Sequence, residues 1–139
     1  MNAARVVVDR EIAGEVGRGL CVLLGVASED DEAVAERLAG KVARLRIFEN
    51  DEGRFDRSVL DVHGGALVVS QFTLIADTAK GNRPSFTGAA EPEQAERLYE
   101  GFCETLESYG IDVGRGRFGG RMTVEIANDG PVTIVLDSP

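Results

Sequence analysis

The chain has 139 residues, 43% of them hydrophobic and 28% charged, which is typical of one globular domain covering residues 1–139. Its formal net charge of −9 argues against broad, charge-driven binding to nucleic acid, because such binding needs a basic surface. No stretch resembles a signal peptide or reaches the roughly 18 apolar residues of a membrane span, so we expect a cytoplasmic protein without membrane contact. Cys21 and Cys103 lie in apolar stretches and are expected to be buried thiols.

The first half of the chain predicts a hairpin, a buried strand and a helix. Residues 5–8 are rich in β-branched side chains, and a short turn separates them from residues 12–16, which indicates a β-hairpin. Residues 20–26 form a continuous apolar run, typical of a strand buried on both faces. A helix follows, with Ser28 as its expected N-cap. Its apolar stripe consists of Val34, Leu38, Val42 and Leu45.

The second half predicts further strands around one long helix. Residues 47–48 indicate a short strand and residues 66–72 a second buried strand. Residues 92–109 predict a helix that opens on proline and stops at a glycine. Residues 122–126 alternate in polarity, and residues 132–136 are expected to return beside them as the second arm of a hairpin. Together these elements predict an α+β fold, with a curved antiparallel or mixed β-sheet or a small β-barrel packed by two main α-helices.

The sequence lacks the residues that several classes of enzyme need. The one histidine, His63, lies in a predicted loop, where a polar surface role is the common one. No His, Cys or Asp set has metal-ligand spacing, and neither a Gly-x-Ser-x-Gly elbow nor a phosphate-binding loop is present. We therefore expect no metal and no cofactor.

A first candidate site lies at residues 70–74, where the second buried strand changes abruptly to polar residues. Strand ends present side chains and free backbone N–H groups to ligands. Ser70 and Thr73 offer hydroxyls, Gln71 offers an amide, and backbone N–H groups could stabilise an oxyanion. The alternative is a strand bending into a turn, with the hydroxyls bonded to the local backbone.

A second candidate site lies at Gly130-Pro131. The sequence Asn128-Asp129-Gly130-Pro131 is typical of a hairpin turn. The alternative is a cis bond before Pro131, which would expose the preceding carbonyl in a fixed direction. Two rigid carbonyls beside a pocket could sense which substituent of a chiral centre points at them.

Two basic loops interrupt the acidic surface. Lys80 and Arg83 flank a Gly-Asn step, and a glycine-rich loop carries Arg115, Arg117 and Arg121. An arginine held by a following proline, as at Arg83, can meet a phosphate or a carboxylate. The alternative is a solvated loop that serves only solubility.

These segments together resemble the D-aminoacyl-tRNA deacylases. Residues 70–74 are similar to the first signature of that family, and residues 128–133 are similar to its second, the Gly-cisPro motif. The resemblance covers nearly the whole chain from about Val6, with family patterns in the right order at residues 45–48, 60–62, 76–78, 80–86 and 136–138.

The resemblance implies a homodimer that hydrolyses the ester between a D-amino acid and the 3′ end of tRNA. Gly130 and Pro131 of one subunit are expected to enter the other's site and exclude L-amino acids sterically, which would leave glycyl-tRNA(Ala) as a stray substrate. A hydroxyl without an adjacent base is a weak nucleophile, so positioning by Thr73, with help from the tRNA 2′-OH, is favoured over covalent catalysis. The implied catalytic segment is Ser70, Gln71, Phe72 and Thr73, and the implied tRNA contacts are Lys80, Arg83 and Arg117.

One departure from the family keeps other functions open. Family members begin with an additional strand that carries a supporting arginine, whereas residues 1–5 are too few to supply it. Either the start of the chain is wrong or truncated, or the protein has a shortened N-terminal strand, which would leave an exposed sheet edge. One alternative function is a non-enzymatic nucleic-acid-binding or structural dimer on this fold. Another is a small-molecule ester hydrolase that uses Thr73 or Ser70.

Overall fold

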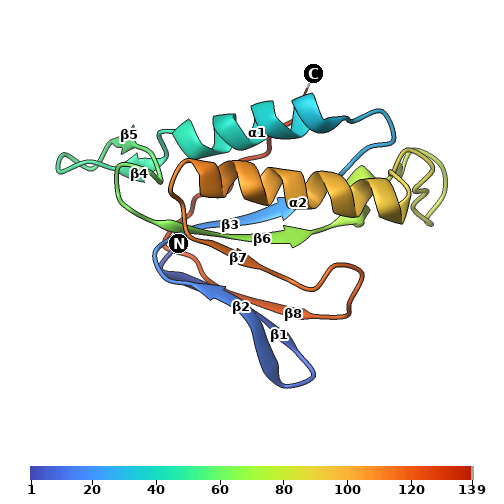
Figure 1. Ribbon diagram of the computed structural model, residues 1–139, viewed down its shortest axis with the longest axis horizontal. Helices are drawn as coiled ribbons and strands as arrows, with labels where there is room; N and C mark the ends of the chain where they lie inside the picture. Colours follow the sequence, from blue (N-terminus) through green and yellow to red (C-terminus); the bar gives the residue numbers. More distant parts are fainter. Residues whose placement is uncertain (139) are drawn as a thin grey trace.

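The computed structural model describes residues 1–138 and has three layers (Figure 1). Helices α1 and α2 pack side by side on one face of the sheet β3-β6-β7, and the sheet β2-β1-β8 covers its other face. The helices are α1 (Glu32–Arg44), α2 (Pro92–Ser108) and the 3-10 helix η1 (Phe72–Ile75). The strands are β1 (Ala3–Val8), β2 (Glu11–Val16), β3 (Gly19–Leu24), β4 (Phe48–Glu49), β5 (Phe55–Arg57), β6 (Gly65–Ser70), β7 (Val113–Arg115) and β8 (Thr123–Ala127).

Strand β6 is the centre of the molecule. It pairs in parallel with β3 and with β7, and α1 and α2 provide the two long crossovers. Ala66 and Val68 face the helices, whereas Leu67 and Val69 face β1, so every one of these side chains is removed from water. This burial on both faces confirms the prediction for the second apolar run, although the strand ends at Ser70, two residues before the predicted end.

The first apolar run behaves differently from its prediction. Strand β3 lies at the edge of its sheet, and Leu23 is 45% exposed, so burial on both faces was wrong for this run. The predicted N-terminal hairpin is confirmed as β1–β2. Because β8 pairs with the other side of β1, the edges of that sheet are β2 and β8.

The helix ends follow local capping chemistry. Asp31, not the predicted Ser28, caps α1 by accepting a hydrogen bond from the Val34 N–H at 2.9 Å. Ser28 instead donates its backbone N–H to Gly88, in the loop that leads to α2. Helix α2 begins at Pro92 as predicted, and Gly110, at φ 89°, follows its end. No helix within residues 1–138 has both the length and the apolar character that a membrane span requires.

The predicted returning strand at residues 132–136 does not form. The Asn128 side chain bonds back to the Val132 carbonyl at 3.4 Å, and the chain then leaves β8 instead of pairing with it. Leu136 packs against the core beside α1, while Ile134 and Val135 are 50% and 84% exposed. Within the described residues β8 pairs only with β1, so the sheets form no closed barrel and the curved mixed sheet is the correct alternative.

Candidate active site

The first candidate segment begins where β6 ends. Ser70 pairs with Leu24, the Gln71 N–H donates to the Leu24 carbonyl at 2.8 Å, and the chain then turns into η1. The first N–H groups of a helical turn have no acceptor inside that turn. Here this leaves the amides of Phe72 and Thr73 available to a ligand at the end of the sheet. The end of the buried strand therefore positions two backbone N–H donors at the surface.

The side chains of this segment lie at the surface of the same end of the sheet. Ser70 and Gln71 are half-buried, and Thr73 is exposed. The Gln71 amide donates a hydrogen bond to the Thr73 hydroxyl. The only histidine, His63, precedes β6 at its opposite end, about 16 Å away for five strand steps, so it provides no base to Thr73.

Gly25 supports this segment and was missed by the sequence analysis. A Cβ at Gly25 would lie 3.0 Å from the Leu74 Cβ and 3.2 Å from the Gln71 carbonyl oxygen. The turn therefore packs directly on the backbone that follows β3. The available signal was a glycine interrupting an apolar run, which often marks a close backbone approach.

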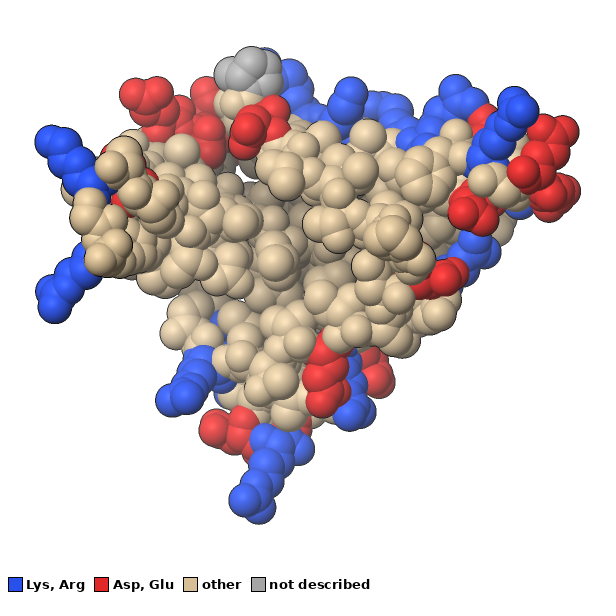
Figure 2. Space-filling view, turned by 180° about the vertical axis from the view of Figure 1, so that it is seen from behind, with Lys and Arg blue, Asp and Glu red and all other residues tan. Residues whose placement is uncertain are grey.

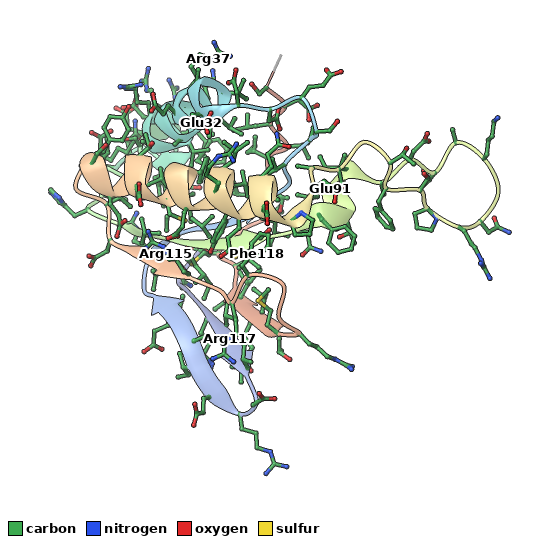
Figure 3. All side chains as sticks on the ribbon, turned by 45° about the vertical axis from the view of Figure 1, so that its right-hand side comes forward. Glu32, Arg37, Glu91, Arg115, Arg117 and Phe118 are labelled. Carbon is green, nitrogen blue, oxygen red and sulfur yellow. The ribbon has the colours of Figure 1, made fainter. Side chains whose placement is uncertain are left out.

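A projecting loop carries two of the predicted tRNA contacts. It leaves η1, and two hydrogen bonds of 2.7 and 2.8 Å between the Asp77 and Ser85 backbones close its base (Figure 3). Lys80 and Arg83 are exposed on it. The Phe72 and Phe86 rings meet edge to face at 5.1 Å between centroids, so the base of this loop is tied to the candidate segment.

Arg117 lies at the same end of the sheet, because it follows β7 and the Gly116 N–H donates to the β6 carbonyl of Val68 at 3.3 Å. Phe118 packs on Tyr99 of α2, with ring centroids 6.1 Å apart (Figure 3). Arg115, by contrast, forms ion pairs with two glutamates of α2 and is not available to a phosphate. The three predicted contacts Lys80, Arg83 and Arg117 thus follow strand and helix ends near Ser70.

The Gly130–Pro131 peptide bond is cis, which resolves the alternative left open by the sequence. A Cβ at Gly130 would lie 2.6 Å from the Val132 N, so the loop has no room for a side chain there. Both residues are exposed. The motif therefore presents bare backbone to its surroundings.

This motif lies at the other end of the molecule from Ser70. Ala127, just before the loop, pairs with Ala3 of β1, and Met1 exchanges backbone hydrogen bonds with Gly19. Gly19 is where β3 begins, opposite the end at which β3 pairs with Ser70. One chain alone therefore does not bring the two candidate segments together.

Two hollows flank the sheet. The larger, of about 1070 Å³, lies at the starts of β3 and β6, and His63, Arg18 and Tyr109 are among its lining residues. The smaller, of about 150 Å³, lies beside Gly25 and Ile75. The larger hollow is thus remote from Ser70. The candidate active site lies in the open, at the end of the sheet where β6 finishes.

Neither cysteine is a reactive thiolate. Cys103 is buried, and burial raises the pKa of its thiol to about 12. Cys21 is half-buried, and burial raises its pKa as well. Both thiols are free, as predicted, although Cys21 is less buried than expected.

The chain is similar to named proteins along nearly its full length. The family model described as D-Tyr-tRNA(Tyr) deacylase matches residues 1–137. D-aminoacyl-tRNA deacylase of Roseiflexus castenholzii is 58% identical over 138 residues, which are 99% of this chain and 88% of that protein. The enzyme of the same name from Deinococcus radiodurans is 54% identical, covering 99% and 94% of the two chains. The chain belongs to the D-Tyr-tRNA(Tyr) deacylase family.

Solved structures agree with this fold. The c-Myc DNA unwinding element binding protein superposes with a TM-score of 0.92 at 43% identity, covering 99% of this chain and 94% of that one. A probable eukaryotic D-amino acid tRNA deacylase superposes with a TM-score of 0.76 over 94% and 91% of the two chains. At 17% identity the second likeness supports the fold alone.

Proposed function

We propose that this protein hydrolyses the ester bond of D-aminoacyl-tRNA and releases the free D-amino acid and tRNA in the cytoplasm. The observation that carries the proposal is the exposed helical turn Phe72–Ile75, whose first backbone amides, those of Phe72 and Thr73, lie at the end of the buried central strand β6. The family membership of the chain supports the same activity.

The chemistry rests on the backbone at the end of β6. Water adds to the ester carbonyl carbon, and the N–H groups of Phe72 and Thr73 stabilise the negative charge that develops on the carbonyl oxygen. The ester bond then breaks, and the ribose oxygen leaves with a proton. Thr73 positions the substrate and is not the nucleophile, because within residues 1–138 its hydroxyl has the Gln71 amide, and no base, as its side-chain partner. Help from the terminal ribose 2′-OH in activating water completes the proposal.

Selection by chirality is assigned to the Gly-cisPro loop. In this proposal the backbone carbonyls of the exposed Gly130-Pro131 loop lie beside the α-carbon of the substrate and leave space there for hydrogen, but not for a side chain. L-amino acids are thereby excluded rather than D-amino acids preferred. Glycine has no side chain to reject, so deacylation of glycyl-tRNA(Ala) belongs to the same proposal.

The site requires two copies of the chain. Because Gly130 and Ser70 lie at opposite ends of one molecule, we assign the Gly-cisPro loop to the site of a partner in a homodimer. The face shown in Figure 2 is largely uncharged and hollowed, with Lys, Arg, Asp and Glu at its periphery. A charge-poor, concave face of this kind supports contact with another protein surface.

The tRNA contacts are few and local. The net charge of −9 opposes wrapping by nucleic acid, whereas Lys80, Arg83 and Arg117 are exposed near the end of β6. This distribution supports binding of the aminoacylated 3′ end only. Neutralising any one of these three residues is expected to lower the affinity for tRNA.

A second candidate function is nucleic-acid binding without catalysis. The name of the structural relative at 43% identity says that it binds a DNA unwinding element. The exposed basic loop would serve such binding as well as it serves tRNA.

One assay separates the two functions. The purified protein is incubated with D-Tyr-tRNA and with L-Tyr-tRNA, and the remaining ester is followed with time. Loss of only the D ester supports the deacylase, whereas retained nucleic-acid binding without ester loss supports the alternative.

Two substitutions in the same assay assign the roles. Thr73→Ala tests nucleophilic catalysis, since a nucleophile cannot be removed without near-complete loss of the rate. Pro131→Ala tests the chiral filter, and unchanged discrimination between the D and L esters would refute it.

A further inference from the structure

A buried tyrosine reaches the strand that carries the site. Tyr99 of α2 is 3% exposed, and its hydroxyl donates a hydrogen bond of 2.7 Å to the Val68 carbonyl oxygen. Val68 lies in β6, two residues before Ser70. The second donor to this carbonyl is the Gly116 N–H, at the longer distance of 3.3 Å.

The Tyr99 hydroxyl donates its single proton to the Val68 carbonyl oxygen. Burial raises the pKa of Tyr99 well above its usual range, so the phenol keeps this proton at neutral pH. A buried carbonyl that loses its shorter hydrogen bond keeps only the weaker contact with Gly116. The Tyr99 hydroxyl therefore determines how firmly the end of β6 is held against α2.

The next residue of α2 holds the neighbouring strand. Glu100 accepts two hydrogen bonds from Arg115 Nε, at 2.8 and 3.0 Å, and Glu107 accepts two more from its guanidinium. Arg115 is paired in register with Val68 across β6 and β7. Residues of α2 from Tyr99 to Glu107 thus hold both strands at the same level, just before Ser70 on β6 and Arg117 after β7.

We propose that Tyr99 is a positioning residue of the deacylase, which holds the end of β6, and with it the Phe72 and Thr73 amides, in the geometry that the reaction needs. The proposal rests on the proposed function, because the amides matter only if the ester reacts there. Tyr99 does not reach the surface, so it acts through Val68 and not on the substrate.

The test is the variant Tyr99→Phe, which keeps the ring and removes only the hydroxyl. With D-Tyr-tRNA we expect kcat to fall about tenfold, while KM changes less than about twofold, because misplaced donors weaken the transition state more than binding. The matched control is Tyr109→Phe, which likewise removes only a hydroxyl. That hydroxyl accepts a hydrogen bond from Arg44 at 3.2 Å. Tyr109 lines the hollow at the opposite end of the sheet, and its variant should keep wild-type kcat.

Two further measurements keep the result interpretable. Val59→Ala shortens a buried side chain beside the start of β6 and provides a comparison at similar loss of stability. If Tyr99→Phe lowers kcat no more than Val59→Ala does, or leaves kcat unchanged, the positioning role is overturned. The amide NMR signals of Gln71 and Gly116 should shift in Tyr99→Phe and not in Tyr109→Phe. This readout holds even if the wild-type protein fails to hydrolyse the ester, so a failure of the proposed function is distinguishable.

Discussion

The two candidate segments differ in how the protein holds them. The segment that follows β6 continues a strand buried on both faces, and it is fixed by the Leu24 carbonyl and by packing on Gly25. The Gly-cisPro loop leaves an edge strand, is exposed, and is fixed only by its own geometry and by Asn128. The core therefore preorganises the first segment, whereas the second is an exposed loop, which we propose enters the site of another molecule.

The largest effect is expected from Gly130→Ala. The added Cβ would lie 2.6 Å from the Val132 N, so the loop must shift. We expect kcat/KM for D-Tyr-tRNA to fall about a hundredfold, as for displacements of about 1 Å at other reacting centres. The melting temperature should stay close to that of wild type, since the loop is exposed. A large loss of stability instead would show that the loop supports the fold.

The next effect separates the buried support from the loop. Gly25→Ala would press a Cβ against Leu74 and the Gln71 carbonyl, and we expect kcat to fall about tenfold with a loss of stability of about 1–3 kcal/mol. Gly25→Val, which places a larger side chain at the same position, should lower kcat further, toward the loss expected for Gly130→Ala. The control is Gly101→Ala within α2, where an added Cβ meets nothing within 4 Å. This substitution should stabilise the protein by about 0.5–1 kcal/mol. Equal activity of the two alanine variants would show that Gly25 does not support the active segment.

A smaller effect concerns the tie between α2 and β7. The Arg115 guanidinium lowers the pKa of Glu107 below its ordinary 4.5, so this carboxylate contributes stability above that pH and loses it as the pH falls further. In Glu107→Gln the free energy of unfolding should decrease less between about pH 5 and pH 3 than in wild type. Urea titrations across this range measure it, and parallel curves for the two proteins would contradict the assignment.

The smallest effect lies away from both segments. Asp9 and Arg10 form the β1–β2 turn with φ of 49° and 67°, a conformation that glycine adopts more readily. Arg10→Gly should raise the free energy of unfolding by about 1 kcal/mol and leave deacylation unchanged. Thermal unfolding and the D-Tyr-tRNA assay check the two halves of this expectation. A change in activity would mean that this turn communicates with the site.

Local patterns predicted much of the fold. The hairpin at the N-terminus, the doubly buried strand before Ser70 and the helix that opens at Pro92 each follow from a repeat or cap that a few neighbouring residues define. Ser28 failed as a cap because Asp31 lies one residue before α1 and offers a better-placed carboxylate. The residues after Val132 have the composition of a strand, but pairing depends on a partner that no local pattern names.

The site was less predictable than the fold. Residue types pointed to Ser70 and to Gly130, yet their separation along the sheet depends on the register of β1, β3 and β8. Gly25 and Tyr99 act through contacts across 46 and 31 residues of sequence, which no motif records. The cis bond at Gly130 was one of two open alternatives, because an isolated Gly-Pro is compatible with either isomer.

The most direct test of a shared site is complementation between subunits. Gly130→Ala and Gly25→Val are each expected to leave the homodimer with little activity, but a mixed dimer combines one intact β6 end with one intact loop from the partner. Co-expression of equal amounts should restore about one quarter of the wild-type D-Tyr-tRNA deacylation, because half the dimers are mixed and each has one complete site. A mixture no more active than either variant alone would contradict the claim that the two segments act from different subunits.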